Sequence, residues 1–290
     1  MTARDWTTDE LIVSWISHQV EDGEVIAQGL ATPLVSAAFI LAKLTHAPNL
    51  LFAEAAGGVL TREWSPLSLT RQEEASLRNP LHLFSFDEAT GILLPAFQLK
   101  EFLRPGQVDP QGNTNNVVFG DHSTPRLRLP GCGGIADVTV YSPNLYLYVP
   151  RHSRAVFAER LDFISGVGVR DAAERERLGI VGTGPRHLIS NLGVFDFLEG
   201  RMRLVSHHPN VPVDRIQRRT GFPILISADL EETSPPTDHE IQLLRREIDP
   251  KGLRRLELLS GPRRRALLRE VSEQEEAESM DEERDGGPGG

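Results

Sequence analysis

The sequence predicts an α/β protein with an open, mostly parallel sheet and helices on both of its faces. Helix and strand patterns alternate through the first 54 residues. The helix expected at residues 34–45 is apolar nearly all round, as a helix packed against a sheet would be. A short apolar run at residues 50–53 then reads as a buried strand. This alternation favours parallel strands joined by crossover helices.

The first element is a helix that opens with a capping box. Thr7 and Glu10 have the spacing in which each side chain bonds the backbone N–H of the other residue. Leu11 and Trp15 then place apolar side chains one helical turn apart. We expect the helix to end at Gly23, because glycine is favoured just beyond a helix C-terminus.

Two strands and a second helix follow. Residues 24–28 predict a short strand, and Pro33 suits the first position of the helix at 34–45. The buried strand at 50–53 ends directly before Glu54. In open parallel sheets, ligands bind outside the carboxyl ends of the strands. Glu54 is therefore a candidate site residue from its position alone, with a strand-end cap or an arginine pair as the structural alternative.

The remainder of residues 1–260 predicts more elements of the same domain. Strand candidates are short runs rich in β-branched and aromatic residues, and the last helix should stop at Asp249-Pro250. We expect helices at 69–77, 93–102, 212–219 and 239–248, and strands at 137–141, 145–149, 163–165, 187–192, 202–206 and 223–227.

Residues 261–290 have a different composition, basic and then acidic. Arg263–Arg265 begin a possible short helix to Val271, and glycines dominate the last five positions. Between Glu273 and Asp285 there are eight acidic residues and one arginine, a local charge of −7 within a net charge of −10. So polar a segment buries too little apolar surface to offset its ordering entropy. We expect a largely disordered, solubilising tail; contact with the preceding arginines is the alternative.

Composition excludes several classes of function. The body outside the acidic run is nearly neutral, which disfavours nucleic-acid binding. The longest uncharged apolar run, Leu34–Ala42, is far shorter than the ~20 residues of a membrane-spanning helix. The N-terminus has no apolar signal region, and the single cysteine, Cys132, fits a reducing cytoplasm. The nine histidines show no metal-ligand spacing, so no metal site is expected.

A turn-forming segment precedes residue 116. Asp109-Pro110-Gln111-Gly112-Asn113 concentrates the residue types that form tight turns. We expect Asp109, Asn113 and Asn115 to support this turn through bonds from side chain to backbone rather than to touch a substrate.

A glycine loop follows at Gly131-Cys132-Gly133-Gly134. Glycines so closely spaced indicate backbone that adopts positive φ or approaches a ligand closely. Successive N–H groups of such a loop can bind an anion or a developing oxyanion. A tight structural turn is the alternative. Cys132 is a weak candidate nucleophile, because no histidine is placed to activate it.

Taken in order, these segments resemble the β subunit of the family I CoA-transferases, the group that contains the glutaconate and 3-oxoacid enzymes. The resemblance covers roughly residues 7–255. Besides the turn and the glycine loop, it rests on Ala47–Glu54, Glu176–Gly179, Asp214–Ile216, Thr220–Phe222 and Leu244–Pro250.

Two segments depart from the glutaconate pattern. The family glutamate is usually followed by Ser-Gly or Asn-Gly, whereas Glu54 is followed by Ala55-Ala56-Gly57-Gly58. Ser190–Phe197, with Ser165–Gly168 before it, is more similar to a hydrolytic branch that opens a steroid-derived ring on a CoA thioester.

The resemblance implies a Rossmann-like fold and Glu54 as the nucleophile that carries CoA as a glutamyl thioester. It implies that Gly131, Gly133 and Gly134 line the CoA or acyl-carbonyl site. A CoA thioester would be the substrate, with no permanently bound cofactor. An α-type subunit would complete the site, in an α2β2 or larger assembly. Two alternatives stay open: a hydrolase in which Glu54 is a general base, and a non-catalytic binding subunit.

Overall fold

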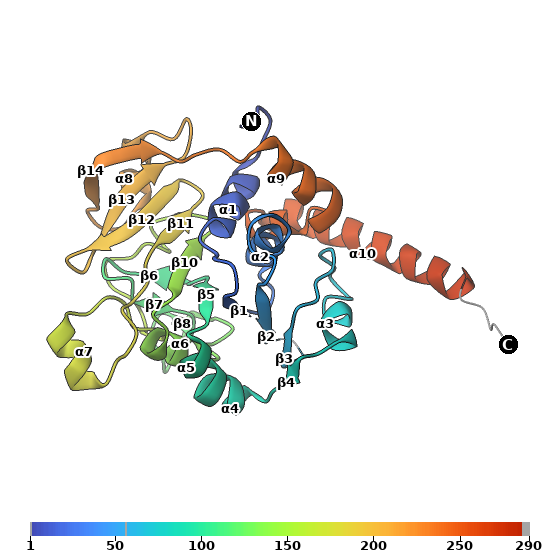
Figure 1. The fold of residues 1–290 in the computed structure, drawn as a ribbon. Coiled ribbons are helices and arrows are strands. Elements are labelled where there is room, and N and C mark those ends of the chain that lie inside the picture. Colours follow the sequence, from blue (N-terminus) through green and yellow to red (C-terminus); the bar gives the residue numbers. More distant parts are fainter. Residues whose placement is uncertain (1, 56, 286–290) are drawn as a thin grey trace.

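A ten-stranded sheet in the order β14-β13-β12-β11-β10-β5-β1-β2-β3-β4 forms the centre of the molecule (Figure 1). The computed structural model describes residues 2–55 and 57–285. The central strands, from β11 to β2, run parallel. Antiparallel pairs flank them, β2 with β3 and β3 with β4 on one side and β11 with β12 and β12 with β13 on the other. The predicted class, an open and mostly parallel α/β sheet, is confirmed.

The strands are short at the centre of the sheet and longer toward the β14 edge. Those of the large sheet are β1 (Val25–Gln28), β2 (Leu51–Glu54), β3 (Val59–Thr61), β4 (His82–Leu83), β5 (Lys100–Leu103), β10 (Leu145–Val149), β11 (Leu188–Ser190), β12 (Gly193–Leu198), β13 (Arg201–His207) and β14 (Leu225–Glu232). Two small ribbons pair β6 (Gln107–Val108) with β7 (Thr114–Asn115) and β8 (Val118–Phe119) with β9 (Leu127–Arg128).

Helices lie on both faces of the sheet. The α-helices are α1 (Thr8–Ser17), α2 (Pro33–Thr45), α3 (Glu74–Arg78), α4 (Phe86–Glu88), α5 (Leu94–Phe97), α6 (Ile135–Tyr141), α7 (Ala172–Leu178), α8 (Val213–Arg219), α9 (Asp238–Leu243) and α10 (Gly261–Asp285). Two π-helical turns, η1 (Ala89–Leu93) and η2 (Leu244–Ile248), and a 3₁₀-helix, η3 (Leu253–Glu257), join them.

Alternate side chains of the central strands pack into two separate hydrophobic cores, one on each face of the sheet. Phe52 and Tyr148 point to the core shared with α1, α2 and the C-terminal helices. Ala53 and Leu147, their neighbours in sequence, point to the opposite core, which includes Ile216 of α8. This alternation follows from the two-residue period of a strand. Both cores lie directly against the strands whose carboxyl ends carry Glu54 and the residues around it.

The N-terminal elements agree with the sequence except at one boundary. The carboxylate of Glu10 accepts a hydrogen bond of 2.8 Å from the backbone N–H of Thr7, at the start of α1. Pro33 is the first residue of α2, as predicted. The helix α1, however, ends at Ser17 and not at Gly23. Gly23, with a φ of 81°, instead forms the turn that leads into β1.

The prediction of a helix at residues 93–102 is wrong in its second half. The helical turns end at Gln98, which has a φ of 50°, and β5 begins at Lys100. This strand lies between β1 and β10, at the centre of the sheet. The charge of Lys100 is tolerated there because its ammonium donates to Glu24 at 2.6 Å and to the carbonyl of Gln19.

Two predicted strands are also absent from the described residues. Residues 137–141 belong to α6, because the chain leaves the glycine loop directly into a helical turn in which the Val138 N–H donates to the Gly134 carbonyl. Residues 163–165 form no strand, and the Ser165 N–H bonds the Thr114 carbonyl instead. Strand β12 was not predicted; it forms a hairpin with β13.

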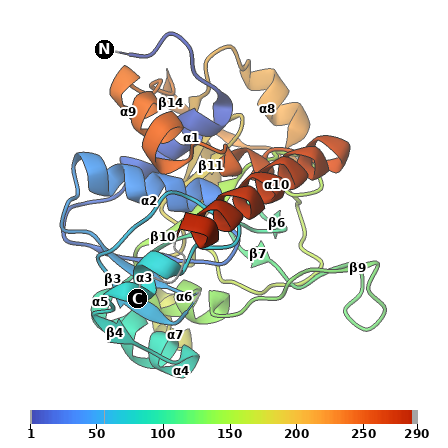
Figure 2. The ribbon, with the colours of Figure 1, turned by 90° about the vertical axis from the view of Figure 1, so that its right-hand side faces the viewer.

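The expectation of a disordered tail is wrong for residues 261–285, which form the long helix α10 (Figure 2). Leu267 and Val271, one turn apart, are 7% and 1% exposed and belong to the core shared with α1 and α2. Glu275 is also buried. One apolar stripe therefore suffices to order a helix whose composition is mostly charged. Residues 286–290 lie outside the described part of the chain.

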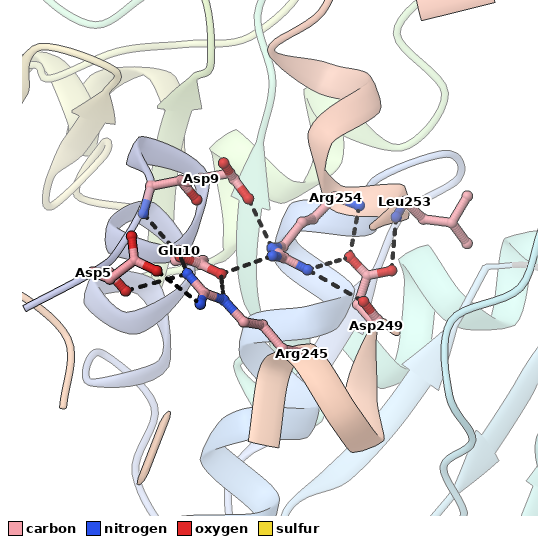
Figure 3. Close-up of polar contacts among 8 residues, drawn as sticks. Asp5, Asp9, Glu10, Arg245, Asp249, Leu253 and Arg254 are labelled. Carbon is pink, nitrogen blue, oxygen red and sulfur yellow. Dashed lines mark hydrogen bonds and ion pairs between the residues drawn. The ribbon is translucent and has the colours of Figure 1, made fainter. Parts of the chain in front are cut away.

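A buried ion-pair network joins α1 to the C-terminal segment (Figure 3). The guanidinium of Arg254 bonds Glu10 at 2.9 Å and Asp249 at 2.9 Å, and it lies 2.8 Å from the carboxylate of Asp9. Arg245 bonds Glu10 at 2.7 Å from the other side. Buried charges of this kind require partners, because isolated they would carry a large desolvation penalty. The network fixes α1 and residues 245–254 to the same side of the sheet.

Candidate active site around Glu54

A cleft of about 890 Å³ lies at the carboxyl ends of the central parallel strands. Gln28 and Glu54 line it at the ends of β1 and β2, Arg104 just beyond β5, and Val149 at the end of β10. This is the location at which open α/β sheets bind ligands. Its volume suits an organic molecule of considerable size.

Glu54 lies at the inner end of this cleft and is 5% exposed. Its Cα pairs with that of Gln28 across the parallel strands. The hydroxyl of Ser76, in α3, donates a hydrogen bond of 2.7 Å to Oε2. Burial raises the pKa of Glu54, the bond from Ser76 lowers it, and the charge of Glu73 raises it. The carboxylate is thus held in one orientation and is poorly hydrated, as a nucleophile or general base requires.

The chain turns sharply after Glu54. The Ala55 N–H still bonds the Gln28 carbonyl, at 3.0 Å. Gly57 and Gly58 adopt φ angles of 74° and 58°, which favour glycine. A Cβ at Gly58 would lie 2.3 Å from the carbonyl oxygen of Phe84, so a larger residue does not fit there. These glycines turn the chain back into β3. Of the two alanines in the unusual segment after Glu54, Ala56 lies outside the described residues.

An arginine on the cleft wall is anchored by a buried carboxylate. Arg104 is 41% exposed at its side chain and pairs with Glu257, whose side chain is 3% exposed. Glu257 also accepts hydrogen bonds of 3.0 Å from the Tyr148 hydroxyl and the Leu34 N–H. Three donors therefore converge on one carboxylate. The ion pair holds the guanidinium of Arg104 in one orientation on the cleft wall.

Asp109 and Asn113 lie in the turn between β6 and β7, and Asn115 is the second residue of β7. The Asp109 carboxylate accepts bonds of 2.9 Å from the N–H groups of Gln111 and Asn113, and of 2.7 Å from the Asn113 side chain. The Asn115 amide donates to Gln107 at 2.7 Å. These contacts hold the turn, and none of the three residues lines the cleft.

The glycine loop lies beside the cleft and not in its wall. Gly131 and Gly133 adopt φ angles of 107° and 47°, and no atom lies within 4 Å of the position where a Cβ would stand on either. Gly134 precedes the first residue of α6. The cleft is lined by Leu129 and Pro130 immediately before the loop, but by none of its three glycines. A role for Gly131, Gly133 and Gly134 in binding CoA stays a prediction.

Other kinds of site find no support in the part of the chain that the structure describes. Residues 2–55 and 57–285 contain no group of three or more histidine, cysteine or acidic side chains placed to hold a metal ion. Cys132 is a partly exposed free thiol. Within the described residues, no helix has both the length and the apolar character to cross a bilayer.

Sequence reasoning missed two residues that contribute to this site. Ser76 follows Glu54 by 22 positions, and nothing in its sequence neighbourhood indicates the contact. Arg104 was missed because residues 93–102 were assigned to a helix. With Lys100–Leu103 assigned to a strand, Arg104 would have marked a second strand end, as Glu54 did.

Comparison with known proteins agrees with this geometry. The family model described as coenzyme A transferase matches residues 93–219. The B-type subunit of the glutaconate CoA-transferase from Acidaminococcus fermentans is 29% identical over 258 residues, which cover 85% of this chain and 94% of that protein. The cholesterol ring-cleaving hydrolase IpdB subunit of Rhodococcus jostii is 31% identical over 235 residues, 80% of this chain and 88% of that protein.

Among solved structures, the decarboxylase AibA/AibB, in its C56A variant, superimposes with a TM-score of 0.75 at 30% identity. The superposition covers 86% of this chain and 98% of that one. Sequence and structure thus agree over nearly the whole length of the relatives. The chain belongs to the family I CoA-transferases and is a B-type subunit of that family.

Proposed function

We propose that this chain carries the catalytic glutamate of a CoA-transferase, which moves CoA from an acyl-CoA to an acceptor carboxylate. The observation that supports this most directly is the buried carboxylate of Glu54, at the carboxyl end of β2 and open to a cleft of about 890 Å³. The curated relatives include a glutaconate CoA-transferase subunit. The acyl-CoA is a substrate, and the proposed reaction needs no resident cofactor.

In the proposed reaction, the carboxylate of Glu54 attacks the thioester carbonyl carbon. The C–S bond breaks, leaving a glutamyl-acyl anhydride and the CoA thiolate. The thiolate then attacks the glutamyl carbonyl and releases the first acid as its carboxylate, which leaves a glutamyl-CoA thioester. A second carboxylate repeats these steps in reverse. An enzyme carboxylate suits the exchange, because its thioester with CoA is close in energy to that of the substrate.

The surroundings of Glu54 favour the first step. Burial removes water that would otherwise stabilise the carboxylate before it attacks. The hydrogen bond from Ser76 holds one oxygen in place, so that the other is free for the attack. The oriented guanidinium of Arg104, on the cleft wall, is available to an anionic group of the substrate. We further propose that the amides of Gly131, Gly133 and Gly134 contact CoA once the partner subunit completes the site.

An α-type partner subunit is supported by the relatives, which are subunits of two-chain proteins such as AibA/AibB. This chain also exposes large apolar side chains over a short stretch of sequence, which is typical of a protein interface. They are Leu77, Leu81, Leu83, Phe86, Ile92 and Phe97, and they are 47–64% exposed. We propose that the partner covers this surface, in an α2β2 or larger assembly. The single cysteine supports a cytoplasmic location.

The experiment uses the assembled complex, acyl-CoA and borohydride. A glutamyl-CoA thioester is reduced by borohydride, so mass spectrometry should find the modification at Glu54 in the wild type and no modification in Glu54→Gln. Glu54→Asp is the matched control, because it keeps the charge but moves the carboxylate by one methylene.

Two other outcomes have defined meanings. Turnover that depends on Glu54 without any trapped adduct would identify a hydrolase, the class named for the ring-cleaving relative, and would make Glu54 its general base. Turnover of the complex that is unchanged in Glu54→Ala would identify this chain as a binding subunit.

A further inference from the structure

The C-terminal helix α10 lines the cleft directly at Gly261, Arg264 and Leu268, and one of its buried carboxylates also holds a separate segment of the cleft wall. Glu275 belongs to the acidic run of α10, yet it is only 4% exposed. Its Oε1 accepts a hydrogen bond of 3.0 Å from the Leu69 N–H. Its Oε2 accepts bonds from the Thr70 N–H at 3.1 Å, the Thr70 hydroxyl at 2.7 Å and the Ser68 hydroxyl at 2.9 Å. Lys251 lies 3.5 Å away. Four donors from one short segment thus converge on this side chain.

The segment that Glu275 holds is followed by the helix whose Ser76 bonds Glu54. Residues 67–69, 72 and 73 line the cleft. The helix α3 begins at Glu74, and its Ser76 bonds Glu54. The Arg71 N–H bonds the Ser68 hydroxyl at 3.0 Å, which stiffens the connection between the two contacts.

We propose that Glu275 is a positioning residue, through which α10 holds residues 68–73 against the cleft so that Ser76 stays bonded to Glu54. The inference rests on the proposed function, since it assumes that Glu54 reacts. A merely solvated acidic residue would not be buried, nor would it collect four hydrogen bonds from a loop of the active site. Among the acidic residues of α10, Glu275 therefore has a role of its own, which is to position residues 68–73 beside Glu54.

The pH dependence of the reaction should report this role. Ser76 lowers the pKa of Glu54 and Glu73 raises it, and both residues lie on the held segment or directly after it. The Ser76 bond is the larger of these two effects, so displacement of the segment should raise the pKa of Glu54 and move the acid limb of the rate profile to higher pH. The charged groups that line the cavities around Glu54 are Glu63, Glu73, Arg104, Arg151, Glu257 and Arg264.

The test compares Glu275→Gln with Glu278→Gln in the assembled complex. Glu278 lies on the same helix and pairs with Lys251 at 2.6 Å, but its side chain is 54% exposed and it does not touch residues 68–70 in the described structure. Both variants remove one negative charge. We expect Glu275→Gln to slow formation of the glutamyl-CoA thioester about ten-fold and to move the acid limb to higher pH, whereas Glu278→Gln behaves like the wild type.

A double-mutant cycle identifies the route of the effect. If Glu275 acts through Ser76, then adding Glu275→Gln to Ser76→Ala should slow the reaction little further, because the effects of residues coupled in one network are not additive. Should Glu275→Gln fail to fold, Thr70→Val removes one donor from the loop side and is expected to give the same direction of change.

The inference is overturned if Glu275→Gln and Thr70→Val match Glu278→Gln in rate and pH profile, or if the losses from Ser76→Ala and Glu275→Gln simply add. A wild-type complex that turns over without any thioester would instead contradict the proposed function, so the two failures are distinct.

Discussion

The hydroxyl of Ser76 donates a hydrogen bond of 2.7 Å to the carboxylate of Glu54, from a helix that lies outside the large sheet. Both residues are buried, at 2% and 5% exposure. The strand places the Glu54 carboxylate, and a separate segment of the chain sets its orientation and its proton affinity. The protonation of Glu54 therefore depends on residues well beyond β2.

Ser76→Ala should weaken catalysis at low pH. Loss of this bond removes the one contact that lowers the pKa of Glu54, so the pKa rises and the ionised form is lost at a higher pH as the solution is acidified. We expect the rate near neutral pH to fall about five- to ten-fold, with the acid limb displaced upward. The measurement is the pH–rate profile of the complex. Ser65→Ala is the control, because Ser65 lines a small cavity together with Ser76 and Glu54 but has no described bond to Glu54; an equal effect there would contradict the assignment.

Arg254→Leu should destabilise the fold strongly. The change leaves Asp9, Glu10 and Asp249 facing one another without their central cation (Figure 3). Breaking a buried pair in this way costs about 3–5 kcal/mol in the free energy of unfolding. Urea unfolding measures the loss. Arg255→Leu removes the next, exposed arginine and should change stability by less than ~0.5 kcal/mol. Comparable losses in the two variants would rule out a special role for the network.

His152 and His208 should make the protein sensitive to acid. Burial lowers the pKa of His152 to about 3 and that of His208 to about 4. As the pH falls from the ordinary histidine pKa toward 4, the unfolded chain binds protons that the folded chain does not, so stability decreases. We expect His208→Gln to flatten the slope of unfolding free energy between pH 5 and 6.5 by roughly 1 kcal/mol per pH unit relative to the wild type. The exposed His239→Gln should leave that slope unchanged.

Phe86→Ser combined with Ile92→Ser should weaken assembly with the α-type subunit. These side chains are 64% and 60% exposed and lie in the apolar surface that we assign to the partner. Because they are exposed in this chain alone, its own melting temperature should barely change. Co-purification of the two subunits is the measurement. Leu198→Ser, which is 42% exposed in the hairpin near the other end of the sheet, is the control. Undiminished co-purification would place the partner elsewhere.

The sequence was most informative where local signals and burial agree. The capping residue Thr7 predicts the start of α1, and the ring geometry of Pro33 predicts the start of α2. The apolar run before Glu54 predicts the carboxyl end of β2. All three signals are local effects. These elements suffice to bring Glu54 to the edge where parallel strands bind ligands.

Errors arose where contacts between distant residues decide the structure. Lys100 has the charge of a surface residue, but Glu24 and the ring of Tyr146, 5.7 Å from its ammonium, make it acceptable in a central strand. Val138 is β-branched yet helical, because tertiary context overrides its weak preference. Glu275 belongs to a segment of disordered composition, and its partners lie more than 200 residues earlier in the chain. A local sequence pattern cannot predict contacts between residues so far apart in the sequence.

The ion pair between Arg254 and Glu10 has a consequence for the order in which the protein can fold during synthesis. The two residues are 244 positions apart, so during synthesis the acidic side chains of α1 have no Arg254 to pair with until all of those residues have been added. Contacts so remote in sequence also slow folding, because a long loop must close first. The core that α1 and α2 share with the C-terminal helices can be completed only after Val271 has been made, and until then its apolar side chains are exposed to aggregation.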